Sequence, residues 1–362
     1  MIFDDKKKAV YLLAHTKGIG SIKGRRVISA LSDITMLFSK IVILRDALTR
    51  IIGEKEYVEL CENVRTFDFD KLEEEYASQE TKIITVVDEE YPKSLMCYED
   101  MPLILYCKGD ISLLNKPCFA VVGTRYPTKY GVRATEEFVS QLSSRFCIVS
   151  GFARGVDSKA HRVCLDVKGK TIAVMGCGVD VVYPAENYAL YKDILSYGLV
   201  ISEYDNKTKA TACNFPSRNR IISGLSSGVL ITEAGEKSGT MITKDYALSQ
   251  GKDVYCVPGS IYSNASGGCN RSIRECQSRA VMDINDIYDE MGIGKVDTKK
   301  PNNIQLDFNE EMILNKLNQN GEMHFEEILD EVDLTVPQLN SLLIKMEAVG
   351  LINKTKTNYW SV

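Results

Sequence analysis

The chain has 362 residues, of which 44% are hydrophobic and 26% are charged, and its formal net charge is −5 at pH 7. This composition is ordinary for a globular protein, and the length exceeds what one core usually needs, so we expect two or three domains. No segment approaches the ~18 consecutive apolar residues of a membrane span, and residues 1–8 lack the apolar core of a signal peptide. We therefore expect a cytoplasmic protein that does not bind a membrane.

The eleven cysteines and three histidines do not indicate a metal site. The number of cysteines is odd, no Cys-x-x-Cys pair occurs, and Cys118, Cys147 and Cys256 lie inside apolar runs, where cysteine acts as a small hydrophobe. We expect neither a bound metal nor a catalytic thiol.

The charge is unevenly distributed along the chain. Residues 111–282 carry 21 Lys/Arg against 14 Asp/Glu, whereas residues 1–110 carry 16 against 20 and residues 306–362 carry 4 against 10. Because neutralisation of phosphates by Lys and Arg supplies most non-specific affinity for nucleic acid, we expect an anionic polymer to bind the middle of the chain.

Residues 1–80 show helical periodicity and predict a small helical domain. A Gly18-Ile-Gly20 turn separates two helical patterns, with Lys17, Lys23 and other basic residues nearby. This pattern is compatible with a helix-hairpin-helix that holds a phosphate on its backbone N–H groups, and equally with a plain helical corner ended by glycine.

Residues 81–290 predict an α/β domain built on a mostly parallel sheet. Short apolar runs, each followed by glycine and a segment of helical period, are typical of parallel strands buried on both faces. These runs are 119–122, 147–150, 171–175 and 228–232, and residues 83–87 and 102–109 supply two further strands. Ligands of such sheets bind at the carboxyl ends of the strands.

The residues after three of these runs have the chemistry of anion binding. Gly123, Thr124 and Arg125 follow the first run, and an arginine there can form two hydrogen bonds to a phosphate. After the second run come Ser150 and Gly151 and then Arg154, and after the fourth come Ser238, Gly239 and Thr240 at the start of a helix. We expect these groups to contact phosphates. Capping of the helix by 238–240 is an alternative.

The segment 214–222 combines one aromatic residue with two arginines. We expect a loop in which Phe215 stacks on an unpaired base while Arg218 and Arg220 hold phosphates, a combination that favours single-stranded over duplex nucleic acid. The alternative is that Phe215 belongs to the core. Residues 176–181 lack the third glycine of a dinucleotide fingerprint and no P-loop motif occurs, so we expect no nucleotide cofactor.

Residues 291–305 have the polar composition of a linker, and residues 306–362 show the pattern of a winged helix. Its predicted recognition helix, within 337–347, has only one basic residue, so we expect this acidic domain to contact protein rather than DNA.

Several ordered motifs resemble the DNA-processing protein A family (DprA, also called Smf). They are Gly123-Thr-Arg125, Ser150-Gly-Phe-Ala-Arg-Gly-Val-Asp157, Gly176-Cys-Gly-Val-Asp180 with Tyr183-Pro184 and Asn187, Ser202-Glu203, Phe215-Pro-Ser-Arg-Asn-Arg220 and Ser238-Gly-Thr240. The resemblance implies an extended Rossmann-like domain that binds single-stranded DNA, preceded by a sterile-alpha-motif-like helical domain. It also implies loading of the RecA recombinase in natural transformation, a homodimer formed through the Rossmann-like domain, and no catalytic residues.

Two other functions stay open at this point. Nucleotide phosphoribohydrolases of the LOG type have a related fold, and Glu233 would then act as an acid or base. A transcription regulator that uses the hairpin and the winged helix is the second alternative, which the acidic C-terminal segment disfavours.

Overall fold

A computed structural model describes residues 3–294, 307–348 and 351–361. The chain divides into two compact units, Met1–Lys295 and Val296–Val362, each of which is described by itself. Most of the predicted linker 291–305 lies outside the described residues. Within these residues, no helix has both the length and the apolar character needed to cross a bilayer.

The first unit begins with helices that pack around a shared core. Buried residues at helical spacing, such as Leu12, Leu48 and Leu60, form this core together with residues of the adjacent sheet. The helices are α1 (Asp5–His15), α2 (Ser21–Ala30), α3 (Met36–Ser39), α4 (Arg45–Ile52), α5 (Glu54–Thr66) and α6 (Phe69–Ser78).

The main sheet has the order β1-β2-β6-β5-β4-β3-β7-β8-β9. From β6 to β9 all neighbouring strands pair in parallel, and β1 and β2 extend the sheet in antiparallel fashion, which confirms the predicted mostly parallel α/β sheet. The strands are β1 (Lys82–Thr85), β2 (Ile104–Gly109), β3 (Cys118–Val122), β4 (Cys147–Ser150), β5 (Thr171–Val174), β6 (Leu199–Ser202), β7 (Gly228–Ile231), β8 (Asp253–Cys256) and β9 (Arg279–Ala280).

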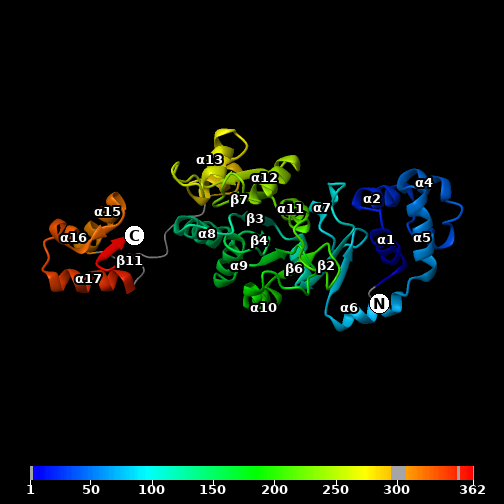
Figure 1. Ribbon diagram of the computed structural model, residues 1–362, viewed down its shortest axis with the longest axis horizontal. Helices are drawn as coiled ribbons and strands as arrows, with labels where there is room; N and C mark the ends of the chain where they lie inside the picture. Colours follow the sequence, from blue (N-terminus) through cyan, green and yellow to red (C-terminus); the bar gives the residue numbers. More distant parts are fainter. Residues whose placement is uncertain (1–2, 295–306, 349–350, 362) are drawn as a thin grey trace. The chain divides into compact units, whose positions relative to one another are not determined.

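Helices cover both faces of this sheet (Figure 1). Alternate strand residues face different clusters: Ile172 and Val174 pack in one apolar cluster with residues of α11, and Ala173 packs in the other with residues of α10. One face carries α8 (Lys129–Leu142), α9 (Val156–Asp166) and α10 (Tyr188–Tyr197), and the other carries α7 (Lys93–Met96), α11 (Asn214–Leu225) and α12 (Thr240–Ser249). The remaining helices of this unit are η1 (Ile111–Asn115), η2 (Ala185–Asn187), α13 (Gly267–Arg274) and α14 (Ile284–Glu290).

The direction of winding reverses between β3 and β7. Strands β3 to β6 follow one another toward one edge of the sheet, whereas β7 to β9 follow one another toward the other edge. At such a reversal the loops after the two central strands diverge and leave a crevice at their carboxyl ends, which is where open α/β sheets bind ligands.

The second unit contains three described helices and a small antiparallel sheet of order β10-β12-β11. Leu339, Leu343 and Trp360 belong to its buried core. The elements are α15 (Phe308–Asn320), β10 (Met323–His324), α16 (Phe325–Glu331), α17 (Val336–Ala348), β11 (Asn353–Lys356) and β12 (Tyr359–Ser361).

Candidate nucleic-acid interface

A cleft of about 1270 Å³ opens at the carboxyl ends of β3 and β7. It brings together the predicted residues Gly123, Thr124, Arg125, Phe215, Arg218, Ser238, Gly239 and Thr240. Sequence reasoning did not assign a role to several other lining residues, among them Tyr126, Tyr183, Lys237 and Ile261. Their aromatic, apolar and basic side chains are exposed, but only the folded chain shows that they share one cleft.

The turn after β3 is held closely against the neighbouring strand. The N–H of Thr124 donates to the carbonyl oxygen of Glu233 at 2.8 Å, and the Thr240 hydroxyl donates to the carbonyl of Gly123 at 2.8 Å. A Cβ at position 123 would lie 2.6 Å from Cγ2 of Val156, so only glycine fits there. These contacts fix the point from which the Arg125 side chain extends.

Arg125 is exposed and its guanidinium lies over an aromatic ring. Its Cζ is 5.8 Å from the centroid of the Phe215 ring, a cation–π geometry. Among the residues that the structure describes, no carboxylate forms an ion pair with Arg125. The planar N–H groups of this side chain are therefore available to an anion in the cleft.

Ser238, Gly239 and Thr240 form the N-terminus of α12. The N-cap position is Gly239, which has no side-chain cap hydrogen bond, but the N–H of Thr240 donates to the Ser238 hydroxyl oxygen at 3.2 Å. Gly239 is exposed and a side chain at its position would meet open space. All three residues line the cleft, so the positive end of the helix dipole lies at the cleft.

The segment from Asn214 was predicted to be a loop. It instead forms the first turns of α11. Arg218 is only 3% exposed, and its Nη1 donates to the carbonyl oxygens of Gly151, at 2.6 Å, and Val174. The prediction that Arg218 holds a phosphate is wrong for this structure, because its donors face the carbonyl ends of β4 and β5. Asp157, which is also buried, supplies an opposite charge nearby, and burial lowers the pKa of the Arg218 guanidinium.

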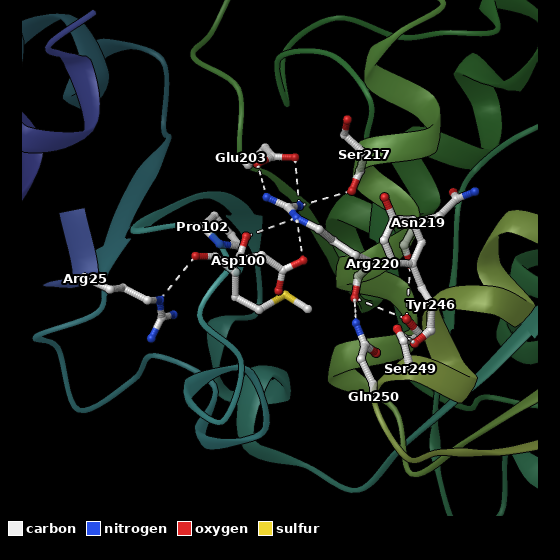
Figure 2. A network of polar contacts seen from close by, with 12 residues as sticks. Arg25, Asp100, Pro102, Glu203, Ser217, Asn219, Arg220, Tyr246, Ser249 and Gln250 are labelled. Carbon is white, nitrogen blue, oxygen red and sulfur yellow. Dashed lines mark hydrogen bonds and ion pairs between the residues drawn. The ribbon is translucent and has the colours of Figure 1, made fainter. Parts of the chain in front are cut away.

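Arg220 likewise faces the interior, and the expectation that it contacts phosphate is also wrong. Its Nη1 and Nη2 donate to the two carboxylate oxygens of Glu203 at 3.0 and 2.7 Å, and its Nε donates to the carbonyl of Asp100 at 3.1 Å (Figure 2). Gln250, the residue directly after α12, donates to the carbonyl oxygen of Arg220 at 3.0 Å. The arginine thus joins α11 to the end of β6 and to the segment before β2.

The second anion site expected after β4 is filled by the protein itself. The Asp157 carboxylate accepts the N–H of Ala153 at 3.4 Å and backbone hydrogen bonds from Gly123 and Gly151. Burial nevertheless raises the pKa of Asp157, and the Arg218 charge opposes that rise. Because a carboxylate already occupies these donors, the prediction of a phosphate site there is wrong.

The individual side chains after β4 have other roles. Ser150 is fully buried and its hydroxyl donates to the carbonyl of Val121 at 2.6 Å. Gly151 is required because a Cβ there would lie 2.6 Å from Nη2 of Arg218. Arg154 is exposed but forms a bidentate ion pair with Glu186, with distances of 2.6 and 2.7 Å, and does not line the cleft.

Glu233, the residue on which the enzyme alternative depends, holds Thr128, the N-cap residue of α8. It is 1% exposed, its two carboxylate oxygens accept the N–H and the hydroxyl of Thr128 at 2.7 and 2.6 Å, and it does not line the cleft. No cluster of His, Cys, Asp and Glu suited to a metal ion occurs within the described ranges.

The hairpin at Gly18–Gly20 is covered by acidic side chains of α5. The N–H of Lys17 donates to Glu59 at 3.1 Å, and Lys23 donates to Glu56 at 3.0 Å. A Cβ at Gly18 would lie 2.8 Å from Oε1 of Glu56. These contacts favour the plain helical corner, because a phosphate would have to displace carboxylates.

Comparisons with known proteins agree with this geometry. The model of the DNA recombination-mediator protein A family matches residues 82–292. DNA processing protein DprA of Streptococcus pneumoniae is 38% identical over 230 residues, which are 62% of this chain and 82% of that protein. The crystal structure of DNA processing protein A from Streptococcus pneumoniae superposes with a TM-score of 0.70 at 33% identity, covering 80% of this chain and 99% of that chain.

A second structure concerns DNA processing protein A of Helicobacter pylori and its single-stranded DNA binding mode. It is 32% identical, superposes with a TM-score of 0.53, and covers 58% of this chain and 95% of that chain. The family model spans more than half of the described first unit and includes every strand of the main sheet. The chain therefore belongs to the DNA recombination-mediator protein A family.

Proposed function

We propose that this chain is a recombination mediator that binds single-stranded DNA in the cleft at the carboxyl ends of β3 and β7 and promotes loading of the RecA recombinase. The observation that carries the DNA-binding part is the pair of Arg125 and Phe215, which places a cation and an aromatic ring 5.8 Å apart in the cleft. Membership of the family and the DNA binding mode described for the Helicobacter pylori protein support the same function.

In this proposal Arg125 and the N-terminus of α12 hold phosphates, and Phe215 contacts a base. Phe215 is only partly exposed, so the base meets one part of its ring. Extrusion of a base from a duplex costs a few kcal/mol, whereas a single strand presents its bases freely. The site therefore binds single strands in preference to duplexes. No residue of the cleft is assigned a catalytic role.

Fluorescence anisotropy with labelled single-stranded and duplex oligonucleotides at one fixed salt concentration tests this function. Replacement of Phe215 by Leu keeps apolar volume but removes the aromatic face, and we expect single-strand affinity to fall by about 1–3 kcal/mol while weak duplex binding is unchanged. Tyr197→Leu serves as the matched control, because this tyrosine is 64% exposed and does not line the cleft. Equal affinity of the unmodified chain for both kinds of DNA would contradict the proposal.

The proposal also includes the partner proteins and the cellular location of the chain. RecA loading in natural transformation and a homodimer formed through the Rossmann-like domain follow from the family resemblance. A cytoplasmic location is the expectation from the sequence composition. Accelerated assembly of RecA on DNA coated with single-strand-binding protein would support the RecA partnership, and sedimentation at several concentrations measures the dimer. An unchanged rate of RecA assembly would contradict the mediator role without affecting DNA binding.

We also propose that residues 306–362 form a winged helix that contacts protein. Their order of elements, helix, strand, two helices and two strands, supports this assignment. The one basic residue of α17, Lys345, forms an ion pair at 2.8 Å with Glu310, which is 2% exposed. A cation engaged in this way contributes little to phosphate binding.

A further inference from the structure

Tyr183 lies in the cleft beside Phe215 but has no role in the interpretation given so far. It belongs to the segment between β5 and η2, and its side chain is 50% exposed. The centroids of the Tyr183 and Phe215 rings are 5.5 Å apart, and the ring planes are inclined by 34°. Both residues line the cleft. The cleft therefore contains a pair of adjoining aromatic rings rather than one.

Phe215 is the more enclosed of the two rings. A Cβ at Gly176 would lie 2.8 Å from its Cδ1, so the backbone at Gly176 closes one side of the ring. The Arg125 guanidinium approaches the ring from within the cleft at 5.8 Å. Tyr183 keeps half of its surface exposed. It consequently offers more open aromatic surface to a base than Phe215 does.

The distance between the rings determines how bases could use them. Contacting carbon atoms are about 3.5–4.0 Å apart, so a base inserted between two parallel rings would need them roughly 7 Å apart. At 5.5 Å there is no room for a base between Tyr183 and Phe215. The two tilted rings instead adjoin each other, so a base can stack only on a ring face that is not turned toward the other ring.

The segment that carries Tyr183 is fixed by its neighbours. The hydroxyl of Tyr191 donates to the carbonyl of Val179 at 2.7 Å, and the N–H of Gly178 donates to the carbonyl of Thr208 at 2.9 Å. Asp180 accepts the N–H of Lys207 at 2.8 Å. A ring held on such a support loses little conformational freedom when a base stacks on it.

We propose that Tyr183 is a second base-stacking residue of the cleft, which extends the aromatic surface of Phe215 to a further base of the same strand. This inference rests on the proposed binding of single-stranded DNA. The anion donors follow β3 and β7, whereas Tyr183 follows β5, which is three strands from β7 in the sheet order and so about 14 Å away. The strand thus crosses the edge of the sheet, with phosphates at the β7 side and stacked bases at the Tyr183 side.

Binding of labelled oligothymidylate, and of a fully abasic oligomer of the same length, tests this inference in the full chain. We expect Tyr183→Leu to weaken oligothymidylate binding by about 5-fold to 100-fold, the range of one lost base stack. Tyr183→Phe keeps the ring and should bind like the unmodified chain, as should Tyr197→Leu. Because the abasic oligomer has no base to stack, its affinity should be the same with Tyr183 or Leu at this position.

Fluorescence quenching distinguishes a residue that stacks on a base from one that only supports the fold. The chain has one tryptophan, Trp360, which is buried in the second unit. In a Trp360→Phe background, Tyr183→Trp places the only indole in the cleft, and we expect saturating oligothymidylate, but not the abasic oligomer, to quench its emission. This variant retains an aromatic ring and decides the question even if Tyr183→Leu fails to fold.

The outcomes separate this inference from the function on which it rests. If the unmodified chain shows no preference for single strands, the proposed function fails and the Tyr183 inference with it. Suppose that the unmodified chain prefers single strands. If Tyr183→Leu then binds oligothymidylate as tightly as the unmodified chain does, only the Tyr183 inference is overturned. The same follows if the substitution weakens binding of oligothymidylate and of the abasic oligomer by the same factor. Absence of quenching in the tryptophan variant at saturation overturns it as well.

Discussion

Nε2 of His15, at the end of α1, lies 2.9 Å from Oδ2 of Asp205, in the segment that follows β6. The other carboxylate oxygen of Asp205 accepts the hydroxyl of Tyr76 at 2.8 Å. Ala210 and Ala212, farther along the same segment, line the cleft. Asp205 therefore attaches a wall of the cleft to the N-terminal helices.

The first prediction is that Asp205→Asn loosens this attachment. Burial raises the pKa of Asp205, but hydrogen bonds from His15, Tyr106 and Tyr76 outweigh it and the net pKa is lowered. A carboxyl group with a lowered pKa stabilises the fold above its unfolded pKa of about 4, and this stabilisation is lost as the pH falls through the folded value. Because the Asp205 side chain is 40% exposed and solvent weakens its interactions, we expect the variant to lose about 1 kcal/mol at neutral pH and to be less sensitive to acid.

Hydrogen exchange of α1 and α6 measures this attachment locally. Asp193→Asn is the matched control, because Asp193 forms an exposed ion pair at 2.7 Å with Arg162 that joins α10 to α9 rather than to the N-terminal helices. Such an exposed pair contributes about 0–1 kcal/mol. Equal protection of α1 in both variants would show that Asp205 does not hold the helices.

The second prediction concerns Arg218, which sequence reasoning assigned to phosphate and the structure places in the interior. Arg218→Met removes the donors to Gly151 and Val174 and leaves the buried Asp157 without its opposite charge. Loss of one partner from a buried charged pair costs about 3–5 kcal/mol. We therefore expect a large fall in the free energy of unfolding, measured by urea denaturation. A stable variant with weakened DNA binding would restore the phosphate hypothesis.

The sequence predicts those features of the fold and the cleft that depend on residues close together in the chain. The parallel strands and the turn at Gly123–Arg125 were predicted because burial on both faces leaves a continuous apolar run that glycine ends. The segment 214–222 was predicted as a loop stiffened by Pro216, yet this proline stands in the first turn of α11, where a helix does not need its N–H.

The direction of the arginines could not be predicted from local sequence. Arg218 and Arg220 are two residues apart and both point inward, because their acceptors come from β4, β5 and the end of β6. Those acceptors, together with the Asp100 carbonyl that Arg220 also contacts, lie 17 to 120 residues away in the chain. The same holds for Tyr183, whose proximity to Phe215 depends on the packing of the loop after β5 against the first turn of α11.

The third prediction is that Arg125→Ala weakens single-strand binding irrespective of sequence. Removal of one phosphate contact from a single strand makes the slope of log affinity against log salt shallower by about 0.7. Titrations at several salt concentrations measure this slope. The control is Arg154→Ala, because Arg154 already pairs with Glu186 and does not line the cleft. An unchanged slope in a folded Arg125→Ala variant would remove this residue from the site.

The fourth prediction is that a chain ending at residue 303 keeps its affinity for single strands. Residues 306–362 carry 10 acidic against 4 basic residues, and Lys345 is paired with Glu310. This segment should therefore repel DNA rather than hold it. Anisotropy titration of the shortened chain beside the full chain checks this expectation. A large loss of affinity, with the core still folded, would show that the second unit binds DNA.

The last prediction concerns His161, which is fully buried beneath the loop after β4. Its Nδ1 lies 2.6 Å from the hydroxyl oxygen of Thr171, and no hydrogen-bond partner for its Nε2 is recorded among the described residues. Burial, assisted by the nearby Arg218 charge, lowers the pKa of His161 to about 3. The folded chain therefore holds the neutral ring at pH values where the unfolded chain, with a pKa of about 6.5, is protonated.

Between those two pKa values the unfolded state binds one more proton at this position, so stability rises with pH there. Through this one group the free energy of unfolding falls by up to about 1.4 kcal/mol for each pH unit below 6.5, until the folded ring also titrates. His161→Gln retains a hydrogen-bonding group beside Thr171 but cannot titrate. As the pH falls from 7 to 4, we expect the free energy of unfolding of the unmodified chain to fall more than that of the variant. Urea denaturation of both chains at each pH measures this difference. A difference that stays constant over this range would show that His161 titrates alike in the folded and unfolded states.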